Sequence, residues 1–561
     1  MKRPTLPSLR TGLVAAAMVA TLGACGAATA TPDSSTATAA STSSASTSTS
    51  STATTTNAGT TNAGTTTTTA AAIADLLAAN QASHWSAEDA EYAASEAVKV
   101  TLTGLTASVS GEGASVSGST LTIDQAGTYV LSGTFTGNVV INVPKEDVIL
   151  VLDDATITSN GTSAVEIQAA DEVTVVLADG STNTIADSAS YSDEAEGAAS
   201  AAIDSKADLS ITGGGALTVT GNHNDAINSS DGLAIAGGTL TIKAADDGLR
   251  GQDYVSITGG TVTVDAGGDA LKSDNDTDET RGYVHVADGT LTLTAGDDGI
   301  SASTDALVSG GTTTINAQGD GVHADAQLAI GGGTTTIAQS NEGLESKLIL
   351  IAGGTTSVTS SDDAVNVSDG SGSGGMGGGG GNSATSGLML TITGGTLVID
   401  SQGDGLDSNG SIEMSGGTVV VSGPTNSGNG ALDVNGTFEI SGGTLIAAGA
   451  SGMAEAPETD SAQGWVSATI SSAYPAGTVV SIVDSSDKVV ATYTADKAFS
   501  SVVFSSSAIT NGETYTIYVG GSASGDTVGG LATSGSIEGA TNIGTVTAGQ
   551  HSGGQGGPGG R

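Results

Sequence analysis

Apolar and polar residues alternate with a period of two along most of the chain from Val98 onward, as in "VKVTLTG", "STLTI" and "NVVINV". Successive side chains of a β-strand point to opposite sides, so this period is typical of strands with one buried face. The pattern predicts an all-β protein. Before the strands begin, we expect one short helix around Ile73 to Ala79.

The alternation belongs to an internal repeat marked by Gly-Gly-Thr. Apolar pairs such as Leu233 and Ile235 precede the glycines, similar pairs follow them, and a single apolar residue such as Ile227 marks a third short strand. The threonine of the motif lies at Thr239, Thr261, Thr312, Thr334, Thr355, Thr396, Thr418 and Thr444, with Asp288-Gly289-Thr290 in the same place once. Most steps between these threonines are 21 or 22 residues, which is typical of a solenoid.

Three strands and three corners in about 22 residues describe one coil of a single-stranded parallel β-helix. Identical positions of successive coils then stack roughly 4.8 Å apart. A leucine-rich repeat is the rival solenoid, but its helical half is missing from this sequence. After about Gly449 the repeat stops, and the alternation in "TVVSIVD" and "KVVATYT" predicts a small antiparallel β-module that caps the open edge of the last coil.

Changes in composition divide the chain into six segments. They are a signal peptide at 1–24, Cys25 with a Ser-, Thr- and Ala-rich disordered linker at 25–72, an N-terminal cap at 73–97, the β-helix at 98–448, the C-terminal β-module at 449–545 and a disordered tail at 546–561. The linker is nearly all small or polar residues, so it cannot bury a core.

The one cysteine has a position that explains its presence. Leu22-Gly23-Ala24-Cys25 follows a basic start and an apolar run from Gly12 to Leu22, and it resembles the lipobox of bacterial lipoproteins. That resemblance implies cleavage before Cys25, acylation of its thiol with palmitate, and an extracytoplasmic protein anchored to the membrane and exposed at the cell surface. A secretory signal with a chance cysteine is the alternative.

The formal net charge of −45 changes the range of possible partners. Such an excess of carboxylates repels nucleic acid phosphates, so we expect no nucleic acid partner. It suits a protein that recruits divalent cations. The oligomeric state stays open.

An acidic residue recurs in the turn before the third short strand. These residues are Asp225, Asp247, Asp269, Asp298, Asp320, Glu342, Asp363 and Asp404, with a second carboxylate before three of them at Asp246, Asp297 and Asp362. Stacked at about 4.8 Å, each neighbouring pair repels by about 1 kcal/mol in water and 3 to 4 kcal/mol at an effective dielectric of 20. The column therefore favours Ca²⁺, which accepts six to eight oxygen ligands. The alternative is that these residues serve only the turns, since Asp satisfies local backbone amides.

The run from Ala201, "AAIDSKADLSITGGGALTVTGNHNDAINSSDGLAIAGGTLTIKAADDGLRGQDYVSITGG", with "GTYVLSGTF" and "VLDDATITS" upstream, resembles the bacterial carbohydrate-binding β-helix family related to pectate lyases. The resemblance implies a right-handed β-helix, bound calcium, and binding of pectin-like or cellulose-like polysaccharides by residues 98–448. Two coils depart from the pattern, at Asn341-Glu342-Gly343 and at Asn429-Gly430, which puts their metal binding in doubt.

Three functions remain open: calcium-dependent polysaccharide binding, pectate lyase activity, and a non-catalytic structural or adhesin role. A lyase needs a base near the sugar. Arg250 and Lys272, at equivalent positions of neighbouring coils, are the best candidates, with His323 two coils beyond Lys272. A basic residue beside an acidic column is more often a charge balancer. The five histidines are scattered singly, which disfavours a zinc site.

The lipobox yields a direct prediction. Replacing Cys25 with Ala removes the thiol that carries the lipid, so we expect the variant to appear in the medium or to keep its signal peptide. Fractionation of cells into membrane and medium measures this. Unchanged membrane association of Cys25→Ala would contradict the lipobox interpretation.

Overall fold

The computed structural model describes residues 73–192, 195, 198–370 and 384–551. The predicted signal peptide, Cys25 and the linker lie outside the described residues, as does most of the tail. Within the described residues, no helix is long and apolar enough to cross a membrane.

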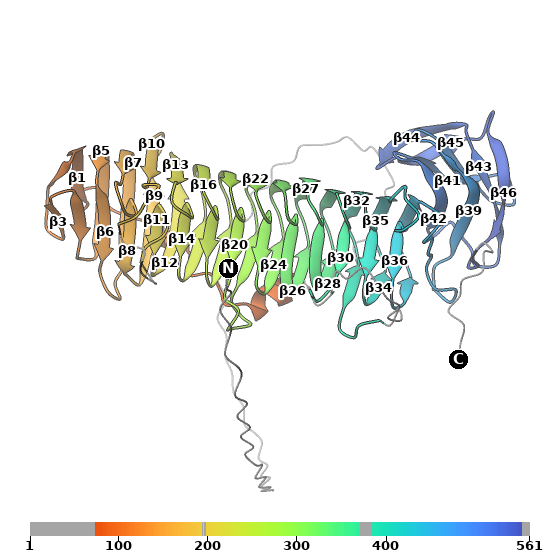
Figure 1. Cartoon of the computed structure of the whole chain (residues 1–561), viewed down its shortest axis with the longest axis horizontal. Helices are drawn as coiled ribbons and strands as arrows, with labels where there is room; N and C mark the ends of the chain where they lie inside the picture. Colours follow the sequence, from red (N-terminus) through yellow and green to blue (C-terminus); the bar gives the residue numbers. More distant parts are fainter. Residues whose placement is uncertain (1–72, 193–194, 196–197, 371–383, 552–561) are drawn as a thin grey trace, which may run out of the picture. The chain divides into compact units, whose positions relative to one another are not determined.

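The body of the protein is a parallel β-helix, as the repeat predicts (Figure 1). One coil consists of β14 (Ile227–Ser229), β15 (Gly232–Ile235) and β16 (Thr239–Ala244). These three strands pair in parallel with β17, β18 and β19 of the next coil, with Thr239 opposite Thr261. The pairing continues from coil to coil and produces three parallel sheets, which we call the first, second and third sheet in chain order.

The first sheet contains the shortest strands. Its members are β4 (Thr120–Ile123), β6 (Asn138–Asn142), β8 (Val165–Ala169), β11 (Ile203–Ser205), β14, β17 (Leu249–Gly251), β20 (Leu271–Ser273), β23 (Ile300–Ala302), the starts of β26 (Val322–Ile330) and β28 (Leu344–Ile351), β30 (Val365–Val367), β33 (Leu406–Ser408) and β36 (Leu432–Val434).

The second sheet continues from the ends of β26 and β28. Its other members are the starts of β1 (Val98–Gly104), β5 (Gly127–Thr136) and β7 (Val148–Thr158), then β9 (Glu172–Leu177), β12 (Asp208–Gly213), β15, β18 (Tyr254–Ile257), β21 (Tyr283–Val286), β24 (Asp305–Val308), β31 (Met389–Ile392), β34 (Ser411–Met414) and β37 (Phe438–Ile440).

The third sheet holds the strands that follow Gly-Gly-Thr corners. Its members are the ends of β1, β5 and β7, then β10 (Thr182–Ala186), β13 (Ala216–Gly221), β16, β19 (Thr261–Ala266), β22 (Thr290–Ala295), β25 (Thr312–Ala317), β27 (Thr334–Gln339), β29 (Thr355–Ser360), β32 (Thr396–Ser401), β35 (Thr418–Ser422) and β38 (Thr444–Gly449).

The alternating apolar residues of all three sheets fill one continuous core. Leu249, Val255 and Val262 are each fully buried, and residues at the same positions of neighbouring coils join them. Burial of such a side chain stabilises the fold by roughly 1.5 to 3 kcal/mol. The corner glycine is required where the coils approach closely. Gly260 has a φ of +91°, and a Cβ there would lie 3.0 Å from the carbonyl oxygen of Gly238.

The outer surface of the third sheet carries two files of hydroxyl side chains, which we call the threonine face. One file runs in register through Thr103, Thr134, Thr156, Thr184, Thr218, Thr241, Thr263, Thr292, Thr314, Thr336 and Ser357. The other runs through Thr239, Thr261, Thr290, Thr312, Thr334, Thr355, Thr396, Thr418 and Thr444. In β16, β19 and β22 these residues are exposed and alternate with buried core residues.

The cap expected at 73–97 does not cover the first coil. Two short antiparallel strands do so instead: β2 (Thr106–Val109) pairs with β1, and β3 (Ala114–Ser117) pairs with β4. Val109 and Val116 of these strands pack against the end of the core. The cap is therefore built from within the segment assigned to the coils, because antiparallel hairpins there close the open strand edges.

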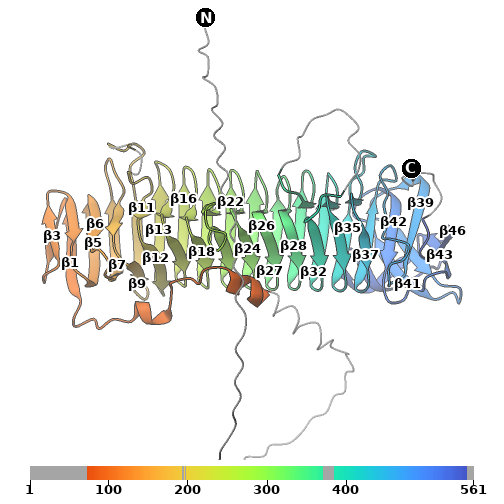
Figure 2. The same ribbon diagram turned by 90° about the horizontal axis from the view of Figure 1, so that it is seen from below.

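Residues 73–97 form a strap along the side of the stack (Figure 2). The strap begins with the expected helical turns at 73–79 and includes the short 3₁₀ helix η1 (Ala87–Ala90). Ile73 packs against Leu307 and Ala329. The hydroxyl group of Tyr283 donates to the carbonyl oxygen of Gln81 at 2.7 Å. The strap thus lies outside the second sheet.

The C-terminal module is antiparallel, as predicted. β39 (Trp465–Tyr474) and β42 (Phe499–Ser505) pair with each other, and β42 also pairs with β38, which covers the last edge of the third sheet. A separate antiparallel sheet of the module holds β40 (Val479–Val483), β41 (Val489–Thr494), β43 (Thr514–Val519), β44 (Ser522–Val528), β45 (Leu531–Ser536) and β46 (Thr541–Thr547). The module therefore extends two residues beyond the expected boundary at 545.

The module also covers the outside of the third sheet in the last coils. Val420 and Ile446 belong to its apolar cluster. The hydroxyl groups of Ser422 and Tyr493 lie 3.0 Å apart, and Lys497 Nζ lies 2.7 Å from Asp400 Oδ1. In these coils the first file of the threonine face changes to apolar residues, whereas the second file stays threonine.

The strap explains a departure from the repeat at Gly331, where a third glycine precedes Gly-Gly-Thr. A Cβ at Gly331 would lie 2.5 Å from Ile73 Cγ1. We expect Gly331→Val to displace the strap and to destabilise the protein by about 1 to 3 kcal/mol through overpacking. Thermal denaturation and limited proteolysis of residues 73–97 measure the effect. Ser415→Val, at the equivalent and exposed position of a later coil, is the control, and equal protease resistance of the two variants would contradict the assignment.

Candidate ligand-binding ridge

The predicted acidic residues lie along one corner of the stack, between the third and the first sheet. Asp247, for example, follows the end of β16 at Ala244 and precedes the start of β17 at Leu249. The register of the flanking strands carries this position from coil to coil. We call the eleven acidic residues of this corner the acidic ridge.

A hydrogen-bond ladder runs along the ridge. Each backbone N–H donates to the carboxylate of the preceding coil: Asp247 N to Asp225 Oδ1 at 3.1 Å, Asp269 N to Asp247 Oδ1 at 2.9 Å, Asp298 N to Asp269 Oδ1 at 2.9 Å, Asp320 N to Asp298 Oδ1 at 2.7 Å, Glu342 N to Asp320 Oδ1 at 3.1 Å and Asp404 N to Asp363 Oδ1 at 2.5 Å. One carboxylate oxygen of each of these aspartates therefore has a structural role, which is the turn chemistry that sequence reasoning held as the alternative.

The longer side chain of Glu342 departs from this ladder. Its Oε2 accepts a hydrogen bond from Asn366 Nδ2 at 2.6 Å. In the last coil the backbone N–H of Gly430 donates to Asp404 Oδ1. Gly430 has no carboxylate to accept a further hydrogen bond, so the ladder ends there.

The outer carboxylates require glycine in the coil that follows them. A Cβ at Gly268 would lie 2.5 Å from Asp246 Oδ1, a Cβ at Gly319 2.7 Å from Asp297 Oδ1, and a Cβ at Gly403 2.5 Å from Asp362 Oδ1. Each coil with Asp-Asp is accordingly followed by a coil with Gly-Asp, and a coil with Asn-Glu comes once, after Gly319-Asp320, before the pair recurs. This alternation is a sequence signal for the packing of the outer carboxylates that we did not recognise from the sequence.

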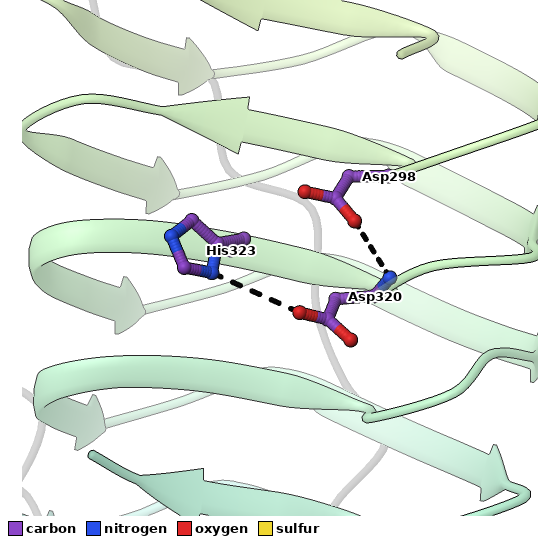
Figure 3. A group of neighbouring side chains, drawn as sticks. All are labelled: Asp298, Asp320 and His323. Carbon is purple, nitrogen blue, oxygen red and sulfur yellow. Dashed lines mark hydrogen bonds and ion pairs between the residues drawn. The ribbon is translucent and has the colours of Figure 1, made fainter. Parts of the chain in front are cut away.

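Ligand atoms of the ridge converge at several places. The structure brings them within 4.8 Å of one another in four groups: Asp225, Asp246 and Asp247; Asp269, Asp297 and Asp298; Asp298, Asp320 and His323; and Asp320, Glu342 and Glu345. Figure 3 shows the third group, in which Asp298 faces the backbone nitrogen of Asp320 and His323 faces the Asp320 carboxylate. Glu342 thus stays within a carboxylate group although it departs from the ladder. Asp362, Asp363 and Asp404 lie on the same corner but in none of these groups of described residues.

The two candidate bases are engaged with acidic partners. Arg250 and Lys272 are paired in register. Lys272 Nζ lies 3.1 Å from Asp247 Oδ2 and 2.8 Å from Asp269 Oδ2. Burial alone would lower the pKa of Lys272, but its hydrogen bond to Asp269 and the charges of both aspartates raise that pKa above its ordinary value. The ammonium group therefore stays protonated at neutral pH and is a poor general base.

Arg250 and His323 are held in the same way. Arg250 Nη2 donates to Asp274 Oδ2 at 2.6 Å, and Nη1 donates to Asn228 Oδ1 at 3.1 Å. Hydrogen bonds to Asp320 and Glu345 raise the pKa of His323 to about 11. These three basic side chains form ion pairs with acidic side chains in the coils where they occur, which is the arrangement expected of charge balancers.

A second acidic file lies beside the ridge and was missed from the sequence. On the first sheet, Glu345, Asn366, Asp407 and Asp433 follow one another in register. Burial and the charges of Asp363 and Asp433 raise the pKa of Asp407 to about 8. The spacing of three residues after each ridge position, as from Asp404 to Asp407, could have revealed this file. At its last three positions, Asn366, Asp407 and Asp433, this file contains no Lys, Arg or His.

The fold and the ridge define an all-β, parallel β-helical protein with stacked carboxylates. Residues 117–364 match the model of a family described as "Carbohydrate-binding domain-containing protein". A curated protein of that description from Acetivibrio thermocellus is 34% identical over 137 residues, which cover 24% of this chain and 48% of that protein. The match thus spans about half the length of this relative.

A solved structure is also similar to part of the chain. It is titled "Structure of the polysaccharide lyase-like protein from C. thermocellum, Gadolinium derivative" and is 32% identical. The alignment covers 42% of this chain and 96% of that chain, with a TM-score of 0.41.

The raised carboxylate pKa values predict how stability depends on pH. Burial and neighbouring carboxylates raise the pKa of Asp225, Asp298 and Asp404 to about 7 and that of Asp407 to about 8. The native state then binds more protons than the unfolded state up to about pH 8, so stability falls as pH rises through this range. Burial lowers the pKa of His285 to about 4, which opposes the trend only below about pH 6.5.

We therefore expect the melting temperature in chelator to fall between pH 6.5 and 8. Differential scanning calorimetry at four pH values measures this. Asp407→Asn removes one of the titrating groups and should flatten the decline. A melting temperature that rises across this range would show that the ridge carboxylates are already ionised and compensated.

Proposed function

We propose that the chain binds acidic, pectin-like polysaccharides through calcium ions held on the acidic ridge. The observation that carries the proposal is the convergence of carboxylate oxygens within 4.8 Å in successive coils. The match of residues 117–364 to a carbohydrate-binding family supports a polysaccharide as the partner. A carboxylate surface alone repels uronates, whereas a calcium ion between the two attracts both.

The ridge offers oxygens that the fold itself does not use. The ladder occupies only Oδ1 of each aspartate, and the outer carboxylates of Asp246 and Asp297 add further ligands. Asp225 Oδ2 is buried and has no hydrogen-bond partner among the described residues, with Arg250 Nη1 3.8 Å away. Ca²⁺ suits this set because it accepts several oxygens in flexible geometry. When bound, the ion would supply positive charge, and the ridge residues would hold it.

A binding role fits the site better than lyase chemistry does. Lyase activity needs a base that is free to accept a proton beside the sugar. Lys272 and Arg250 are instead fixed between carboxylates. A structural or adhesin role would keep the same ridge without affinity for a sugar. Anchoring at the cell surface through Cys25 would place the ridge toward extracellular polymers.

The test is retention on immobilised polygalacturonate. We expect the wild-type protein to bind with calcium and to elute with chelator. Changing Asp246, Asp247 and Asp269 to Asn keeps side chains that can accept ladder hydrogen bonds but removes three charges. The apparent affinity should therefore fall at least about tenfold, or about 1.4 kcal/mol. The matched control changes the exposed Asp153, Asp171 and Asp526 to Asn.

Two results would contradict the proposal. Retention that is equal in calcium and in chelator would remove the metal from the mechanism. Sustained release of unsaturated uronates that disappears in Arg250→Ala with Lys272→Ala would make the protein a lyase.

A further inference from the structure

The threonine face is uncharged in a chain whose net charge is −45. Its two files place only Thr or Ser at their outward positions from Thr239 to Ser357. The acidic ridge begins only a few residues beyond the end of each of these strands, as at Asp246 after β16. Carboxylates are thus absent from the two files between Thr239 and Ser357, although Asp265 lies outward in the same sheet and others crowd the neighbouring corner.

Strand propensity alone does not account for the two files. The outward position two residues further along the same strands varies freely, with Lys243, Asp265 and Thr294 in successive coils. Where the C-terminal module covers the sheet, the first file changes to Val398 and Val420, and a Cβ at Gly529 of the module would lie 2.8 Å from Val398 Cγ1. The first file therefore carries hydroxyl groups where the sheet is uncovered and apolar groups where the module packs, while the second file keeps threonine in the covered coils as well.

The register fixes the spacing of these hydroxyl groups. Neighbouring strands are about 4.8 Å apart, and alternate residues of one strand are about 6.7 Å apart. The pairings from Thr239 to Thr355 continue without a register shift through both files. The face is thus a two-dimensional lattice of groups that each donate and accept hydrogen bonds, about 50 Å long in the file that starts at Thr103.

We propose that the threonine face binds the ordered surface of an uncharged, crystalline polysaccharide. A periodic array of hydroxyl groups matches a solid whose own hydroxyl groups repeat, and threonine methyl groups displace water from the apolar faces of sugar rings. The inference rests on the proposed function only in that the ligand is a glycan. It uses a different surface and needs no metal, so the protein would have two modes of attachment.

Tyrosine stacking does not provide this contact. The central coils contain Tyr254 and Tyr283, whose rings stack with centroids 5.6 Å apart. Both are buried beneath the strap, where Tyr254 accepts a hydrogen bond from the backbone of His84 and donates one to Asp208. They are therefore closed to a sugar.

The experiment measures adsorption of the full chain to microcrystalline cellulose and to crystalline chitin in chelator. The array variant changes Thr241, Thr263 and Thr292 to Lys, which breaks the lattice with three long charged side chains. The matched control makes the same change at Thr514, Thr541 and Thr545, which are exposed strand residues of the module. We expect the control to adsorb like the wild type and the array variant to lose at least about tenfold in affinity. Circular dichroism and the melting temperature confirm that both variants fold.

Three outcomes would overturn the inference. They are equal adsorption of the array and control variants, adsorption to neither solid by the wild type, and preferential adsorption to ice, which would identify a hydroxyl lattice other than a glycan. Calcium-dependent retention on polygalacturonate is measured on the same variants. Because the array substitutions leave the ridge intact, we expect the array variant to be retained on polygalacturonate like the wild type. If the wild type itself is not retained, the proposed function is refuted, and the role of the threonine face is still decided by adsorption to the crystalline solids.

Discussion

In-register parallel pairing between coils is the constraint on which the rest of the structure depends. Backbone hydrogen bonds join each strand to the same strand of the next coil, so one position in the repeat becomes a file of side chains about 4.8 Å apart. Leu249 lies opposite Leu271, and Arg250 lies opposite Lys272. A residue type that stabilises one coil therefore stabilises every coil in which it recurs, and a destabilising residue type is repeated in the same way.

The acidic ridge is a file in which stacking is unfavourable, and its contacts offset the repulsion. Stacked carboxylates repel each other, and the ladder offsets this by giving each Oδ1 a backbone N–H, as between Asp247 and Asp269. Lys272 and His323 add positive charge in the central coils. Burial and mutual repulsion still raise the pKa of carboxylates along the ridge, both beside these partners, as at Asp298, and where no such partner lies near, as at Asp404 and Asp407. A divalent cation would relieve the same repulsion.

The repeat could be predicted from the sequence because it is local and periodic. The threonine of each Gly-Gly-Thr motif pairs with the next one, as Thr239 does with Thr261, and the ridge residues occupy one corner. The strap could not be predicted, since the contact of Ile73 with Ala329 joins residues far apart in the chain. Its trace in the sequence is a single glycine out of pattern, Gly331 under Ile73. Periodicity reveals what repeats, whereas these contacts occur once.

The threonine face and the acidic ridge differ in the electrostatic energy of stacking the same residue type in successive coils. A file of neutral hydroxyl groups repeats without electrostatic penalty, so it can run unbroken from Thr103 to Ser357. A file of carboxylates accumulates repulsion with every coil. It is accordingly interrupted or compensated by Lys272, by His323, and at its end by Gly430. The same backbone geometry therefore permits an extended regular surface only where the side chains are uncharged. On the charged corner it creates discrete clusters, and that is the form in which separate cations can be held.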